Sequence, residues 1–145
     1  IKNLLFSGYP SEIINTKIIK KKIIHCHPGK LPEYKGSTTI YYSILSERNI
    51  YCTCLELNQK IDDGKILHIK KFRIPRKIEN IETTYSDQIR AKTLISYLKL
   101  QKKRIIQAKF LRKKSTISQT YYIAHPIIRQ IVLNKKKLLI LKNLI

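Results

Sequence analysis

The stretch "IIHCHPGKLPEYKGSTT", Ile23 to Thr39, carries two histidines separated by one residue and followed at once by proline and glycine. Ile23 to His27 is predicted to form a strand, because β-branched residues lead up to Pro28, which has no N–H for a central ladder. Two prolines and Gly29 within five residues predict a loop over Pro28 to Lys35. The histidines are therefore expected at the end of a strand, beside an irregular loop.

A helix is predicted directly after this loop, with Ser37 as its N-cap. The apolar residues then recur in a helical stripe: Ile40, Tyr41, Ile44 and Leu45. Similar reasoning predicts the neighbouring elements on either side of the quoted stretch. They are a buried strand over Leu4 to Tyr9, a helix within Pro10 to Lys20, strands over Ile50 to Leu57 and Lys65 to Ile74, and a helix from near Asn80 or Thr83 to Leu98.

The 145 residues favour one domain with a single core, and 43% hydrophobic residues indicate a globular chain. The net charge of +21 would attract nucleic acid, anionic lipid or a phosphorylated substrate. The lysines, however, are spread along the chain without an arginine-rich block, which argues against a dedicated nucleic-acid-binding domain. Three cysteines without a signal peptide favour a reducing, cytoplasmic location, and no apolar run is long enough to predict membrane insertion.

Three kinds of chemistry are open to the histidines. His-x-His and Cys-x-Cys could together bind zinc through His25, His27, Cys52 and Cys54, although such spacing on strands mostly reflects side-chain alternation. A thiolate nucleophile at Cys26 is disfavoured, because alternation turns it away from both histidines and into the core. Acid–base chemistry is the third, since the "DDG" turn at residues 62–64 offers a carboxylate to orient a histidine if the two loops converge.

The motifs His27-Pro28, "LPEYKG" at 31–36 and "DDG" at 62–64 occur together in this order. In order and spacing they resemble the formyltransferases that use 10-formyltetrahydrofolate, among them methionyl-tRNA formyltransferase, glycinamide ribonucleotide transformylase and the sugar N-formyltransferases. The match extends over about residues 4–74, because "LLFSGYPSEI" is also similar to the family's fourth strand and its turn. Each motif alone is weak, and their combination is specific.

The resemblance implies roles for individual residues. His27 matches the catalytic base, and Asp62 would hold its imidazole and favour the charged form. His25 stands where the family has asparagine, and its ring N–H would replace the amide as donor to the oxyanion. The resemblance also implies a folate site with Gly8, Tyr9, Asp63 and Gly64, a substrate loop with Tyr34, Lys35, Gly36 and Ser37, and no metal.

The fold implied is α/β, the C-terminal part of a Rossmann-like formyltransferase domain with a mostly parallel sheet between helices. Residues 1–100 would form this partial catalytic domain, whose upstream strands are missing, and residues 101–145 a basic extension. The expected acceptor is the amine of a nucleotide-linked amino sugar, with 10-formyltetrahydrofolate as donor. Methionyl-tRNA is the alternative acceptor. A second alternative is that the chain is a non-catalytic domain that binds RNA or a partner. A homodimer is possible in either case.

Overall fold

The computed structural model describes residues 3–7, 15, 21–75, 80–102 and 118–134. Within them a four-stranded sheet has the order β1-β2-β4-β5, and β3 and β6 form a second, two-stranded sheet. The strands are β1 (Asn3–Phe6), β2 (Lys22–His27), β3 (Tyr34–Gly36), β4 (Ile50–Leu57), β5 (Gly64–Phe72) and β6 (Gln119–Tyr121). The helical elements are α1 (Thr39–Glu47), the π-helical turn η1 (Ile81–Tyr85), α2 (Ser86–Lys102) and α3 (Pro126–Leu133).

The main sheet is mixed. β1 and β2 run parallel, whereas β4 is antiparallel to both β2 and β5. The α/β class is confirmed, but within the main sheet the expectation of mostly parallel strands holds only for the β1–β2 pair. β4 and β5 form a hairpin because the turn at residues 58–63 is too short for a crossover helix.

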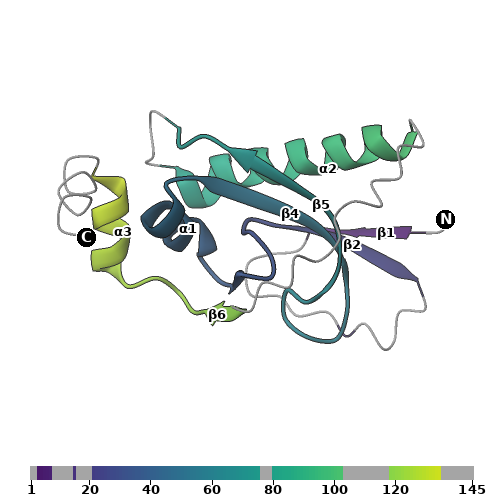
Figure 1. Ribbon diagram of the computed structural model, residues 1–145, viewed down its shortest axis with the longest axis horizontal. Helices are drawn as coiled ribbons and strands as arrows, with labels where there is room; N and C mark the ends of the chain where they lie inside the picture. Colours follow the sequence, from purple (N-terminus) through teal and green to yellow (C-terminus); the bar gives the residue numbers. More distant parts are fainter. Residues whose placement is uncertain (1–2, 8–14, 16–20, 76–79, 103–117, 135–145) are drawn as a thin grey trace.

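The three helices cover the sheet in two places (Figure 1). The long helix α2 lies along β4 and β5, while α1 and α3 lie side by side at one end of the sheet. The stripe predicted for α1 is confirmed, since Ile40, Tyr41 and Ile44 are buried. The core between the layers contains Ile44, Ile50 and further apolar residues of β2, β4 and α2, and each fully buried Ile contributes roughly 1.5–3 kcal/mol to folding.

The short strand β3 was not expected, because Tyr34 and Lys35 fall within the predicted loop. It forms because β6, distant in sequence, pairs with it in parallel and supplies backbone partners. Gly36 has φ 94°, and a Cβ there would lie 2.2 Å from the Tyr121 carbonyl oxygen. This close approach requires glycine. It also fixes β6 against the loop that follows the histidines.

Two predictions about local structure are wrong. Ser37 does not cap α1; the N-cap is Thr38, whose φ is 52° and whose side chain makes no cap hydrogen bond. The Thr38 hydroxyl instead accepts a bond from the Ala124 amide at 2.8 Å. β1 is not fully buried, because Leu5 is 56% exposed on a strand that pairs only with β2 in the described part. The helix predicted over Pro10 to Lys20 lies outside the described residues, apart from Asn15.

Candidate active site

His27 is the last residue of β2, and both nitrogens of its buried ring face oxygen atoms. Nδ1 lies 3.3 Å from Oδ1 of Asp62, and Nε2 lies 2.9 Å from the Tyr34 carbonyl oxygen. A carbonyl oxygen can only accept a hydrogen bond, so Nε2 carries a proton. In the neutral ring the lone pair is then on Nδ1, directed at Asp62. The imidazole is thus held in one tautomer with its basic nitrogen beside a carboxylate.

Asp62 lies in the turn between β4 and β5, with φ 44°. Its Oδ2 accepts a hydrogen bond of 2.8 Å from the Gly36 amide, and Oδ1 faces His27. Burial by itself would raise the pKa of Asp62, but the bond and charge of His27 and the Gly36 amide outweigh it and lower that pKa. The carboxylate therefore stays ionised; it accepts from the Gly36 amide of the loop and lies at ion-pair distance from Nδ1 of His27, to which it bonds when that nitrogen is protonated.

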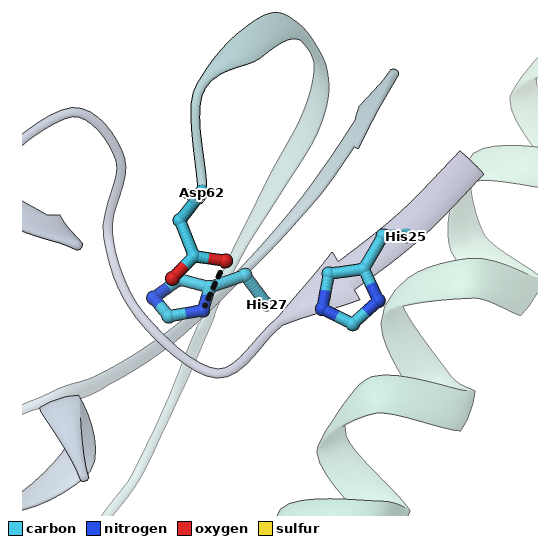
Figure 2. A group of neighbouring side chains, drawn as sticks. All are labelled: His25, His27 and Asp62. Carbon is cyan, nitrogen blue, oxygen red and sulfur yellow. Dashed lines mark ion pairs between the residues drawn. The ribbon is translucent and has the colours of Figure 1, made fainter. Parts of the chain in front are cut away.

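His25 is two residues upstream on the same face of β2 (Figure 2). Its Nδ1 lies 3.2 Å from the Phe6 carbonyl oxygen, and this contact fixes the N–H on Nδ1. Figure 2 shows its other ring nitrogen, Nε2, on the side of His27 and Asp62. Burial lowers the pKa of His25, against the Phe6 bond, which raises it. The neutral ring thus presents a lone pair, and not an N–H, to the site.

Gly29 allows the ring of His27 to lie against the loop. A Cβ at this position would be 2.5 Å from Nε2 of His27 and 2.8 Å from the Tyr34 carbonyl oxygen. The loop is further held by the Thr53 hydroxyl, which donates to the Gly29 carbonyl at 2.6 Å and accepts from the Leu31 amide at 3.2 Å. No pattern in the sequence indicates this role for Thr53.

The other predicted loop residues surround this centre. Lys35 forms an ion pair of 2.9 Å with Asp63, whose pKa is lowered by the Asn58 hydrogen bond and then by Lys35. Tyr34 is buried with its hydroxyl bonded to Ser46. The Ser37 amide donates to the Tyr121 carbonyl at 2.9 Å. Asp63 thus joins the loop to the hairpin turn, one residue away from the His27 contact.

Gly64 starts β5 with φ 138°, in close contact with the Glu56 backbone, so its position in the turn requires glycine. Gly8 and Tyr9, predicted to line the folate pocket, lie outside the described residues.

A contact that the sequence did not reveal involves Thr39, whose hydroxyl donates to the Pro28 carbonyl at 2.6 Å and lies 3.5 Å from Nε2 of His27. The first residue of a helix carries no sequence signal for such a contact.

The zinc site predicted as one alternative from both histidines and two cysteines does not form. The register pairs Cys26 with Cys54 and His27 with Thr53. Strand alternation therefore places Cys52 and Cys54 with Cys26 on the face opposite the histidines. All three thiols are buried in the core, as expected for Cys26, and burial raises the pKa of Cys52.

The chain was compared with known proteins. No protein-family model matches it. It is 31% identical over 70 residues to methionyl-tRNA formyltransferase of Orientia tsutsugamushi (strain Boryong), a match that takes in 46% of this chain and 23% of that protein. The chain thus spans about a quarter of the length of this relative.

Solved structures share the fold. The formyltransferase PseJ from Anoxybacillus kamchatkensis, in complex with UDP-4,6-dideoxy-4-formamido-L-AltNAc and tetrahydrofolate, aligns with a TM-score of 0.56 at 19% identity, covering 83% of this chain and 63% of PseJ. Methionyl-tRNA formyltransferase from Clostridium thermocellum aligns at 0.56 and 17% identity, covering 87% of this chain and 53% of that enzyme.

The described residues thus define an α/β domain with the Rossmann-like fold of formyltransferases. The resemblance of this chain to the formyltransferases is confirmed by the fold and by the sequence match over 70 residues. None of the helices in the described ranges has the length and apolar character needed to cross a membrane.

Proposed function

We propose that this chain contributes the catalytic centre for transfer of a formyl group from 10-formyltetrahydrofolate to a primary amine. The observation that carries the proposal is the contact of 3.3 Å between His27 Nδ1 and Asp62, at the meeting point of two loops. The structures similar in fold include one in complex with tetrahydrofolate, which supports a folate as the donor. The residues of the proposed folate site would be Gly8, Tyr9, Asp63 and Gly64.

In this proposal His27 is the base. A protonated amine cannot attack a formyl carbon, so a proton must leave as the new C–N bond forms. Nδ1 of His27 accepts that proton, and the carboxylate of Asp62 stabilises the resulting imidazolium. When the bond between the formyl carbon and N10 of the folate breaks, the same proton is returned to N10. The products are the formamide and tetrahydrofolate, and His27 is again neutral.

His25 would be the donor to the oxyanion of the tetrahedral intermediate, but its hydrogen bond to Phe6 sets a condition. With the Nδ1 proton committed to the Phe6 carbonyl, Nε2 can donate only from the imidazolium form of His25. Burial disfavours that form. His25 therefore provides a weaker donor at neutral pH than the asparagine found at this position in the family.

We infer that the acceptor is an amino sugar linked to a nucleotide diphosphate. The net charge of +21 suits an anionic acceptor, and the solved relative PseJ was crystallised with a UDP-sugar. In the part of the chain that follows β5, β6 pairs with β3 in the loop of the proposed site, and α3 packs on α1. The loop residues Tyr34, Lys35, Gly36 and Ser37 would face this substrate.

Methionyl-tRNA is the second candidate acceptor, because the 70-residue match is to a methionyl-tRNA formyltransferase. An experiment distinguishes the two candidate acceptors: the chain is incubated with 10-formyltetrahydrofolate and either a panel of UDP-amino sugars or methionyl-tRNA. Mass spectrometry of the acceptor then detects a formyl group. We expect formylation of an amino sugar. Absence of formylation from both acceptors, together with salt-sensitive RNA binding, would overturn the proposal in favour of a non-catalytic RNA-binding domain.

A further inference from the structure

Three side chains of the candidate site bring one possible metal-ligand atom each close together. The ligand atoms of His25, His27 and Asp62 all lie within 4.8 Å of one another. We propose that these residues form a binding site for a divalent transition-metal ion, represented by Zn²⁺. This proposal goes beyond formyl transfer and does not depend on it, because it rests only on the ligand atoms and their partners.

The tautomers of His25 and His27 leave on each ring the nitrogen that faces the other two residues available as a metal ligand. His27 donates its Nε2 proton to the Tyr34 carbonyl at 2.9 Å, and His25 donates its Nδ1 proton to the Phe6 carbonyl at 3.2 Å. In the neutral form of each ring the lone pair is therefore on Nδ1 of His27 and on Nε2 of His25. Figure 2 shows these two nitrogens on the sides of the rings that face each other and Asp62. Neutral imidazole with a free lone pair is the form that binds metals.

The hydrogen-bond partners of the three ligand residues also support a metal site. Metal-binding histidines usually donate the second ring N–H to a backbone carbonyl or carboxylate, which fixes the ring and its tautomer. Both histidines do so here, and the second oxygen of Asp62 accepts from the Gly36 amide at 2.8 Å. All three ligands are thus oriented by backbone groups, and an ion that binds has to replace only the direct contact between Nδ1 of His27 and Oδ1 of Asp62.

The distances are close to those of a bound ion. Zinc binds nitrogen and oxygen ligands at about 2.0–2.2 Å, so neighbouring ligand atoms in a tetrahedron are roughly 3.4 Å apart. His27 Nδ1 and Asp62 Oδ1 are already 3.3 Å apart. The remaining separations reach at most 4.8 Å, so side-chain shifts of about 1 Å would complete the arrangement. Three protein ligands leave further coordination positions open.

The donor atoms also define the class of ion. Two imidazoles and one carboxylate suit first-row transition metals such as Zn²⁺, Co²⁺ and Fe²⁺, whereas Mg²⁺ and Ca²⁺ prefer oxygen ligands. The thiols of Cys26, Cys52 and Cys54 lie on the opposite face of the sheet. A cobalt spectrum of this site should therefore lack absorption from sulfur ligands.

The test is titration of the 145-residue chain with Zn²⁺ by calorimetry and with Co²⁺ by visible absorption. We expect one ion per chain and Co²⁺ d–d bands without sulfur-to-cobalt charge transfer. His25→Asn and Asp62→Asn should each weaken binding at least about tenfold. His125→Asn is the matched control, because His125 is an exposed helix cap whose ring accepts from the Ile127 amide; it should bind like the wild type. Circular dichroism checks that each variant is folded.

Three outcomes would overturn the proposal: no binding of either ion to the folded wild type, wild-type affinity in a folded His25→Asn variant, or a charge-transfer band from a thiolate. Because these measurements need no folate or acceptor, they are separate from the test of formyl transfer. If both proposals hold, Zn²⁺ inhibits transfer and a chelator restores it, since the ion occupies the Nδ1 lone pair of His27.

Discussion

At the scale of single residues, the site depends on which atom of each ring carries the proton. Backbone carbonyls fix the protons of His27 on Nε2 and of His25 on Nδ1. The basic nitrogen of His27 consequently faces Asp62, and His25 has no N–H directed at the reacting centre unless it is protonated. The Tyr34 contact of His27 thus favours the proposed role of this residue as a base, and the Phe6 contact of His25 disfavours its proposed role as an oxyanion donor.

This difference leads to a prediction for His25→Asn. The asparagine amide donates at any pH, without the protonation that burial of His25 disfavours. In the presence of a chelator, we expect kcat for formyl transfer to rise about tenfold at pH 8 and less at pH 6. The measurement is steady-state kinetics at both pH values. A fall in kcat of the folded variant at pH 8 would show that His25 contributes more than a replaceable donor.

Gly29 provides a second prediction at this scale. In Gly29→Ala the new methyl group would lie 2.5 Å from Nε2 of His27, so the ring or the loop must move. Overpacking of this kind costs about 1–3 kcal/mol of unfolding free energy. Urea denaturation measures this loss, and Ser37→Ala, in the same loop, is the control with little expected change. Equal stability of Gly29→Ala and the control would contradict the described loop geometry.

At the scale of elements, the site is assembled by two loops and a remote strand. The β4–β5 turn supplies Asp62, the β2–α1 loop supplies the Gly36 amide, and β6 holds that loop by pairing with β3. Lys35 and Asp63 tie the turn to the loop by an ion pair. Loss of the pairing between β6 and β3 should therefore move the Gly36 amide and weaken its hydrogen bond to the Asp62 carboxylate.

Gly36→Ala tests this coupling. The substitution places a Cβ 2.2 Å from the Tyr121 carbonyl oxygen at φ 94°, and the left-handed conformation alone costs an alanine about 1–2 kcal/mol. We expect faster amide hydrogen exchange in β3 and β6 and a lower unfolding free energy. Unchanged exchange at the Ser37 amide, which donates to Tyr121, would show that β6 does not hold the loop.

At the scale of the whole molecule, the described residues place the proposed site on one face of the main sheet and the thiols on the other. β2 and β4 contribute to both faces by alternation, and α2 covers the thiol side. His68 of β5 is also buried, and its Nε2 lies 3.1 Å from the Ser96 hydroxyl of α2. The core therefore contains an imidazole whose charge would be poorly solvated.

This imidazole makes stability depend on pH. Burial lowers the pKa of His68 from its ordinary value of 6.5, and the nearby Lys70 adds to the effect. Below pH 6.5 the unfolded chain binds a proton that the folded chain does not, so stability is complete above this pH and is lost as the pH falls. Thermal unfolding from pH 8 to 5 should show a smaller decline for His68→Gln than for the wild type. Parallel curves would contradict this assignment.

Much of the fold could be predicted from local sequence, and some of it could not. β2, α1, β4 and α2 follow from β-branched runs and a 3.6-residue period, which depend on neighbouring residues alone. β3 and β6 escaped prediction because each is three residues long and exists only by pairing with the other. The strand pattern alone did not decide how β4 and β5 pair, since strand direction depends on the turn between them.

The candidate site, too, could be predicted from the sequence only in part. The motifs were sufficient to place His27 and Asp62 together, because the resemblance carries their relative position. The tautomers of both histidines, by contrast, depend on carbonyls of Phe6 and Tyr34 that no side-chain pattern reveals. For that reason the sequence suggested His25 as a donor and gave no sign of the three neighbouring ligand atoms.

In the proposed reaction, Nδ1 of His27, beside Asp62, accepts the proton of the attacking amine. The most direct measurement is the single-turnover rate of formyl transfer from 10-formyltetrahydrofolate for the wild type and for His27→Asn, with His125→Asn as control. Loss of a general base lowers such a rate by about 10²–10⁴, so the account predicts a loss of that size in a folded His27→Asn variant and none in the control. Transfer at the wild-type rate by His27→Asn would contradict it.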